Sequence, residues 1–152
     1  MKYGVYSGIE ANEDFSVFEF TSTGPRGPIR KQVVFLPFGD PLFVNLAFGD
    51  IVAEGQPPDD KAVSGNGDRN KVLATVAEIV GMYTTAFPER WVFFRGSTEA
   101  RTRLYRIAID LNYHDLSVQF EILGAFTGAD NQVEPFQKGR PYDAFLVKRK
   151  NH

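Results

Sequence analysis

Residues 91–106 read WVFFRGSTEARTRLYR, and this stretch predicts a strand, a tight turn and a helix in succession. Its first four residues are all apolar, so a strand built from them has two apolar faces, as a central strand covered on each side requires. Gly96 allows the chain to turn, and Ser97 is a residue type that favours helix N-caps. The helix is expected to open at Gly96 and Ser97 and to reach about Leu111. Its predicted buried stripe consists of Ala100, Leu104, Ile107, Ala108 and Leu111.

Short apolar segments bounded by Gly and Pro fill the first third of the chain, and this pattern is typical of antiparallel strands. The strands predicted along the whole chain are 15–22, 29–38, 42–48, 91–94 and 118–122, with two further extended segments at 131–136 and 142–149. A hairpin turning at residues 39–41 joins the second strand to the third. The first long helix is predicted over about 69–86, with Asp68 as its N-cap and Pro88 at its end.

These elements predict an α+β fold, in which a mostly antiparallel sheet of about six to eight strands carries two long helices packed on it. A single domain over 1–152 is expected, because 152 residues with 43% hydrophobic content suit one core. Two segments are predicted to lie outside that core. They are a flexible polar loop at about 52–68 and a frayed basic tail at 148–152.

Composition excludes several classes of function. The chain has no cysteine, which removes disulfides, cysteine zinc sites and thiol catalysis and suits a cytoplasmic protein. The N-terminus lacks the apolar region of a secretory signal, and no segment approaches the ~18 consecutive apolar residues of a membrane helix, so no membrane association is predicted. A net charge of −2 does not favour nucleic acid as a partner, because dedicated nucleic-acid binders carry strongly basic domains.

Four arginines follow the apolar strand, and helical spacing accounts for two of them. Glu99 lies four residues before Arg103, and Asp110 lies four residues after Arg106. Side chains at this spacing are neighbours on a helix surface, so both arginines are expected to form exposed ion pairs. Such pairs contribute only about 0.3–0.5 kcal/mol each, and they predict a solvated surface.

The other two arginines flank the turn. Arg101 has no acidic residue three or four positions away, and it projects beside the predicted buried stripe toward the start of the helix, which Arg95 also reaches. A helix N-terminus presents free backbone N–H groups and the positive end of the helix dipole, both of which favour an anion. The predicted anion site consists of Arg95, Gly96, Ser97, Thr98 and Arg101. Its expected partner is a phosphate-containing ligand or a carboxylate.

A purely structural interpretation of the same residues stays open. In it, Ser97 is an ordinary N-cap and Gly96 only lets the chain turn. Glu99 satisfies the helix dipole from within the first turn and repels an added anion. Arg101 then pairs with a carboxylate elsewhere in the fold.

Candidate catalytic residues are few. His114 and His152 are the only histidines and do not have the spacing of metal ligands, so neither a metal site nor a cofactor is predicted. Tyr105 or His114 can act as acid or base beside a bound phosphate, as in a small metal-independent ribonuclease or phosphotransfer protein of the kind found among bacterial toxins. Three functions therefore stay open. They are a non-enzymatic binding or regulatory module with the anion site, that enzyme, and a protein-interaction partner that uses the exposed hairpin.

Four segments together carry a resemblance to a known family. They read FEFTSTGPRG, NLAFGD, NGDRNKVLATVAEIV and GSTEARTRLYRIAI. The chain resembles a bacterial family of small proteins of about this length whose function is unknown, and GST-x-ARTRLYR is the most specific motif. The resemblance covers most of residues 1–125. It implies no activity and no catalytic residue.

Overall fold

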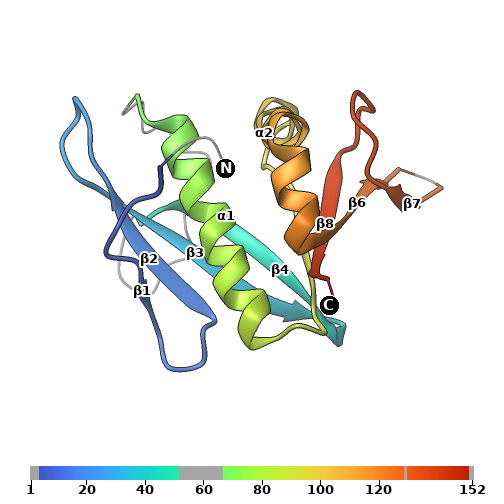
Figure 1. Cartoon of the computed structure of the whole chain (residues 1–152), viewed down its shortest axis with the longest axis horizontal. Helices are drawn as coiled ribbons and strands as arrows, with labels where there is room; N and C mark the ends of the chain where they lie inside the picture. Colours follow the sequence, from blue (N-terminus) through green and yellow to red (C-terminus); the bar gives the residue numbers. More distant parts are fainter. Residues whose placement is uncertain (1–3, 52–66, 129, 151–152) are drawn as a thin grey trace.

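Two long helices lie on one face of an eight-stranded sheet (Figure 1). The computed structural model describes residues 4–51, 67–128 and 130–150. The strand order across the sheet is β1-β2-β3-β4-β5-β8-β6-β7. The strands are β1 (Glu10–Ala11), β2 (Val17–Ser22), β3 (Ile29–Phe38), β4 (Asp40–Asp50), β5 (Trp91–Phe94), β6 (Phe120–Phe126), β7 (Gln132–Pro135) and β8 (Ala144–Arg149). The helices are α1 (Arg69–Ala86) and α2 (Glu99–Gln119).

The predicted α+β fold with a mostly antiparallel sheet is confirmed. Strands β2, β3 and β4 form a meander, and the predicted hairpin turns at Gly39, whose φ of 70° suits glycine. Strand β5 pairs in parallel with β4 on one side and antiparallel with β8 on the other. A parallel pair needs a crossover connection, and α1 lies within that connection. The last strand along the chain, β8, lies inside the sheet between β5 and β6.

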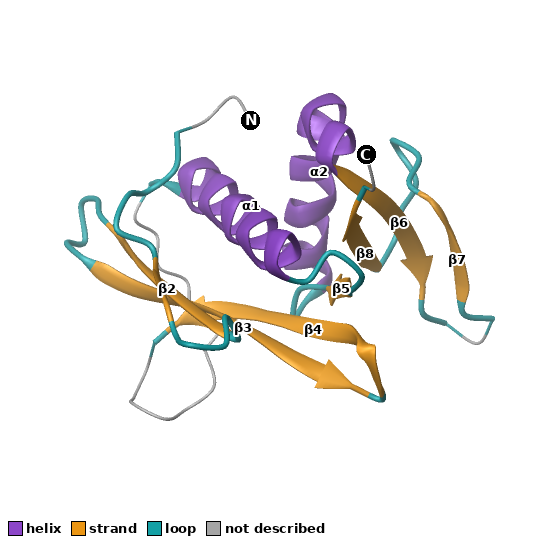
Figure 2. Cartoon of the chain, turned by 60° about the horizontal axis from the view of Figure 1, so that its bottom comes forward, coloured by secondary structure: helices purple, strands orange, loops and turns teal. Residues whose placement is uncertain are grey.

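The two faces of the sheet have different cover. The face toward the helices contributes Phe18, Phe20, Val33, Phe35, Val44, Val92, Phe145 and Val147 to the main core. The opposite face carries a second cluster in which Phe43, Trp91 and Phe93 pack against Leu146. The interior position predicted for Trp91–Phe94 is therefore confirmed. The expectation that a helix covers this strand on at least one side is also confirmed, because the described helices pack on one face of the sheet (Figure 2).

The first helix spans the predicted residues and begins after Asp68, as expected. The Asp68 side chain, however, makes no capping hydrogen bond with the helix. Its Oδ2 instead accepts hydrogen bonds from the Tyr6 hydroxyl and from Ser22 Oγ, the latter at 2.5 Å. This acid therefore ties the start of α1 to β2 and to the N-terminal segment. Most of the predicted polar loop, residues 52–66, lies outside the described residues.

The second helix differs from its prediction at both ends. It begins at Glu99 with Thr98 as N-cap, whose Oγ1 accepts a hydrogen bond from the Arg101 amide at 3.2 Å. Ser97 is therefore not the N-cap. The helix continues past Leu111 to Gln119, so the strand predicted at 118–122 was wrong in its first two residues, and β6 begins at Phe120.

The predicted buried stripe of α2 was wrong at three of its five positions, whereas Leu104 and Ala108 are half-buried. Leu111 is 65% exposed, and Ala100 and Ile107 are exposed as well. The fully buried positions are Thr102, Ile109 and Asn112, and the residues packed beside them on the core are Tyr105, Tyr113 and Leu116. Thr102 Oγ1 and Asn112 Nδ2 donate hydrogen bonds to backbone carbonyls one turn earlier, at 3.1 and 2.8 Å. These bonds offset the cost of burying polar groups, and so the stripe contains residues that do not look apolar.

The basic tail begins in an ordered strand. Lys148 and Arg149 belong to β8, so the fraying predicted for these two residues was wrong. Arg149 Nη2 donates a hydrogen bond of 2.8 Å to the Gly81 carbonyl in α1. Residues 151–152 lie outside the described residues.

Candidate functional site

The junction between β5 and α2 is a tight turn centred on Gly96. A Cβ atom at this position would lie 2.5 Å from Arg101 Cβ and 2.6 Å from the Thr102 amide nitrogen, distances that no side chain tolerates. The Gly96 amide donates a hydrogen bond of 3.0 Å to Thr102 Oγ1. Glycine is therefore required because the chain before the helix folds directly against its first turn.

Several backbone N–H groups at this junction make no hydrogen bond within the described part of the protein. Within the described chain, the amides of Ser97, Thr98, Glu99 and Ala100 have no hydrogen-bond partner, whereas the amides of Gly96 and Arg101 are bonded to Thr102 and Thr98. Unpaired amides at a helix start point outward with the positive end of the helix dipole. They are the donors through which an anion can bind.

A hollow of about 540 Å³ lies beside these amides, and we term it the arginine hollow. Its lining residues are Arg95, Gly96, Ser97, Thr98, Glu99, Thr102, Arg103, Arg106, Pro141, Tyr142 and Asp143. Four of the five residues predicted for the anion site lie here together. Arg101 is not among the lining residues; its Cβ packs against the Gly96 turn instead.

Arg103 is exposed, as predicted, whereas Arg106 is half-buried. Both line the arginine hollow, and the ion pairs expected with Glu99 and Asp110 do not occur among the described residues. Arg106 Nη1 instead donates a long hydrogen bond, 3.4 Å, to the Tyr142 carbonyl in the segment before β8. That contact brings the guanidinium over the hollow. Helical spacing alone could not reveal it, because Tyr142 comes from a distant part of the sequence.

The charge of the arginine hollow is positive. Three arginines and two acidic residues, Glu99 and Asp143, line it. The Asp143 carboxylate already accepts a hydrogen bond of 2.9 Å from the Thr127 amide. The excess of one positive charge, added to the free amides, favours a small anion over a cation or a neutral ligand.

The two candidate acid–base residues lie elsewhere. Tyr105 does not line the arginine hollow. It borders a smaller hollow of about 210 Å³ on the sheet side of Gly96, which we term the sheet-side hollow. His114 is exposed and lies 16 residues after Thr98, which at ~1.5 Å per residue is about 24 Å along the helix. The structure therefore brings Tyr105 close to the junction and leaves His114 far from it.

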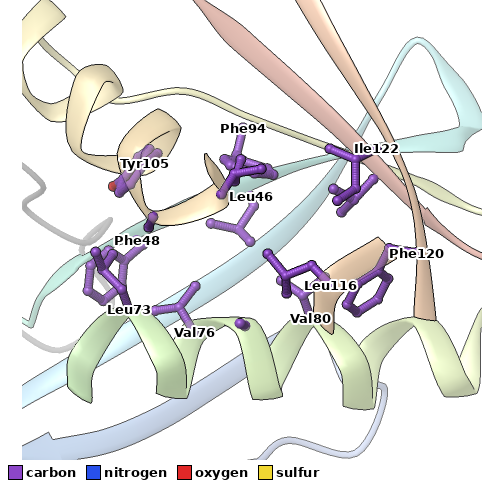
Figure 3. A pocket seen from close by; sticks show the side chains of 14 residues that line it. Leu46, Phe48, Leu73, Val76, Val80, Phe94, Tyr105, Leu116, Phe120 and Ile122 are labelled. Carbon is purple, nitrogen blue, oxygen red and sulfur yellow. The ribbon is translucent and has the colours of Figure 1, made fainter. Parts of the chain in front are cut away.

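A third cavity, of about 100 Å³, lies between α1, α2 and the sheet (Figure 3). It is lined by Leu46, Phe48, Leu73, Val76, Ala77, Val80, Phe94, Tyr105, Ala108, Ile109, Leu116, Phe120, Ile122 and Val147. We term it the apolar cavity. The packing lost around such a volume lowers stability by about 2 kcal/mol at ~24 cal/mol per Å³. No pattern in the sequence indicates this cavity, because the same side chains at the same spacing also build a filled core.

The apolar cavity and the sheet-side hollow are neighbours. Both are lined by Leu46, Phe48, Phe94 and Tyr105. The sheet-side hollow in turn shares Arg95, Gly96 and Ser97 with the arginine hollow. The sheet-side hollow therefore lies between the apolar cavity and the arginine hollow and shares lining residues with each of them.

The part of the chain that the structure describes contains neither a cluster of metal-binding side chains nor a helix that could span a membrane. No three His, Asp or Glu side chains gather closely enough there to hold a metal ion. Neither α1 nor α2 is long and apolar enough to cross a membrane.

Fold and site together define the class: a two-layer α+β domain in which a small hollow beside Gly96 adjoins an arginine-lined hollow and an apolar cavity. The chain belongs to the family of unknown function DUF6934, which matches residues 2–150. The match extends the resemblance, expected to end near residue 125, through β6, β7 and β8. Comparison with curated proteins and with solved structures finds no match.

Proposed function

We propose that the protein is a ligand-binding module that holds a small phosphate-like anion in the arginine hollow. The observation that carries this proposal is the convergence of Arg95, Arg103 and Arg106 beside the free amides of Ser97 and Thr98. Charged donors and oriented amides are the groups that bind phosphate and carboxylate oxygens in proteins.

Each group has a distinct part in the proposed site. The amides at the start of α2 hold the anion at the positive end of the helix dipole. Arg95, Arg103 and Arg106 add guanidinium donors, whose forked geometry suits two oxygens at once. Arg101 shapes the site by packing its Cβ against Gly96, which fixes the turn. Glu99 reduces the attraction and favours an anion of low charge.

Thermal melting in phosphate and in chloride at matched ionic strength tests the proposal. Phosphate should raise the melting temperature by mass action, because it binds the folded state. Arg95→Gln should weaken phosphate binding about tenfold or more, since a hydrogen bond to a charged group contributes about 1.5–3 kcal/mol. The matched control is Arg30→Gln, which removes the same charge from an exposed pair with Glu19 on β3. Equal phosphate responses in the two variants would reject the site.

Protein interaction through the β3–β4 hairpin is a second candidate function. Phe38 at its end is 46% exposed, and Leu36 and Leu42 nearby are more than 40% exposed. Apolar side chains gathered in this way are common in protein interfaces. A photo-cross-linking residue at Phe38 should capture a partner protein, whereas the same residue at the exposed Lys138 should not. Cross-linking that is equal at both positions would remove this candidate.

A further inference from the structure

We infer that the ligand is an amphipathic anion, with a short apolar chain or ring in the apolar cavity and its acidic head at Arg95 and Ser97. The inference rests on the proposed function for the head, and on the apolar cavity for the rest of the ligand. It narrows the ligand class from small anions in general to short-chain or aromatic acids.

The apolar cavity has the composition of a small-ligand site. Its lining is apolar except for the Tyr105 hydroxyl, and it receives side chains from α1, α2, β4, β5, β6 and β8 (Figure 3). A dry cavity of ~150 Å³ lined by similar side chains is known to bind benzene. At about 100 Å³, this cavity is smaller, which suits a single small ring or a short aliphatic chain.

The position of the polar groups gives the ligand its orientation. The sheet-side hollow adjoins the apolar cavity through four shared lining residues, and it is there that Arg95 and Ser97 lie. Polar donors are thus grouped at one end of an apolar space. Binding pockets for small molecules commonly have this form, with an apolar body and a few polar groups that fix orientation.

Size and placement also exclude longer acids. The apolar cavity ends against Phe120 and Ile122, whose side chains are buried in the main core. A long acyl chain would have to displace packed core residues, and overpacking is destabilising. The expected preference is therefore for acids of about six carbons, or for benzoate-like acids, over those of long fatty chains.

Three probes distinguish the binding contribution of the ligand's acidic head from that of its apolar chain. Hexanoate has both parts, 1-hexanol has the chain alone, and inorganic phosphate has the anionic head alone. Calorimetry with the whole protein, at fixed pH and ionic strength, should show that hexanoate binds at least tenfold more tightly than 1-hexanol. Arg95→Gln should lower hexanoate affinity to that of 1-hexanol and leave 1-hexanol binding unchanged.

A cavity-filling variant tests where the apolar chain of the ligand binds. Ala108→Leu extends a side chain that lines the apolar cavity, so binding of hexanoate and 1-hexanol should fall at least tenfold while the phosphate response persists. Ala77→Leu fills the same cavity from α1 and serves if Ala108→Leu fails to fold. The matched control is Ala86→Leu, at an exposed position of α1 outside the lining of all three spaces, which should change none of the three affinities.

The experiments give different results depending on which of the two proposals is wrong. Phosphate binding without any hexanoate or 1-hexanol binding overturns the amphipathic ligand and leaves the proposed function intact. Equal affinities of hexanoate and 1-hexanol in the wild type overturn the assignment of the head. Tight hexanoate binding that survives both Ala108→Leu and Ala77→Leu overturns the assignment of the chain to the apolar cavity.

Discussion

The ring of Tyr142 lies directly over Gly124, so that a Cβ atom at Gly124 would be 2.5 Å from three carbons of the ring. Gly124 is in β6, and Tyr142 is fully buried in the segment before β8. The Tyr142 hydroxyl donates a hydrogen bond of 2.8 Å to Glu134 Oε2 in β7. A glycine inside a strand often marks such a close approach, and here it gives the ring its place.

Gly124→Ala should therefore destabilise the fold. Overpacking typically costs about 1–3 kcal/mol, which exceeds the ~0.5–1 kcal/mol that alanine otherwise gains over glycine through chain entropy. Urea unfolding measures the change. Gly128→Ala is the control, because nothing lies within 4 Å of a Cβ there and its free energy of unfolding should change little. A Gly124→Ala variant as stable as this control would contradict the placement of the ring.

The same tyrosine should make stability fall at high pH. Burial raises the pKa of Tyr142, and the hydrogen bond to the Glu134 carboxylate raises it further. The unfolded chain ionises this residue near pH ~10, while the folded state keeps its proton. Its contribution is thus fully present below pH ~10 and is lost as pH rises through the higher folded-state pKa.

The ionisation of Tyr142 can be followed by absorbance at the phenolate band. The titration curve of Tyr142→Phe is subtracted from that of the wild type. The difference curve should titrate above the ordinary range of tyrosine. Urea unfolding between about pH 9 and 11 should then show a steeper decline for wild type than for Tyr142→Phe. Parallel declines in the two proteins would disprove the link between Tyr142 and stability.

A buried ion pair joins β3 to β4. Lys31 Nζ contacts Asp50 Oδ1, with the two side chains 6% and 16% exposed. Removal of one partner leaves a charge without compensation, so Asp50→Ala should cost about 3 kcal/mol or more. Lys31→Met should cost less, because Asp50 retains more contact with water and the methionine keeps the apolar stem.

The exposed Arg30–Glu19 pair on the same strands provides the comparison. Glu19→Gln should change the free energy of unfolding by no more than about 1 kcal/mol. All three variants can be measured by urea unfolding at neutral pH. The expected order of loss is Asp50→Ala, Lys31→Met, Glu19→Gln, and an Asp50→Ala loss as small as that of Glu19→Gln would contradict the buried pair.

The corrected face of α2 can be tested with two substitutions. Ile109 is buried and Leu111 is exposed, although the sequence pattern assigned the core face to Leu111. Ile109→Ala should therefore lower the free energy of unfolding by about 2–4 kcal/mol, whereas Leu111→Ala should change it by no more than about 0.5 kcal/mol. The reverse order would restore the original stripe.

Local pattern was sufficient for much of the fold. The strands at 29–38 and 91–94 and the helix at 69–86 were predicted closely, because alternation, helical spacing and bounding Gly or Pro residues act over a few neighbouring positions. Strand pairing is decided between distant segments. The parallel pairing of β4 with β5 and the placement of β8 between β5 and β6 therefore had no local signal.

The errors on α2 have a specific cause. Thr102 and Asn112 are buried although they are polar, and Thr102 Oγ1 and Asn112 Nδ2 each donate a hydrogen bond to the helix backbone. Asn112 Oδ1 is buried without a partner among the described residues. A stripe chosen by apolarity therefore fell on the wrong face. Arg103 is exposed, as predicted, and its place in the arginine hollow depends on the segment 141–143.

The candidate site was predictable only where it is contiguous in the sequence. Arg95, Gly96, Ser97 and Thr98 are consecutive, so their proximity follows from chain connectivity, and their role in anion binding stays a prediction. The apolar cavity depends on how closely six elements approach one another. Periodicity reports which face of an element is apolar, but it carries no information on small gaps between faces.

The position of β8 has a consequence for synthesis on the ribosome. Strands β2, β3 and β4 can pair as soon as they emerge, since their partners are adjacent in the sequence. Strands β5 and β6 instead wait for residues 144–149, and until then each presents an open edge to other nascent chains. Translation that stalls near residue 140 should thus leave a protease-sensitive product, which pulse proteolysis of a 1–140 fragment can detect as cleavage within β6. Because β8 lies between β5 and β6, these two strands form all of their hydrogen bonds only after β8 has left the ribosome.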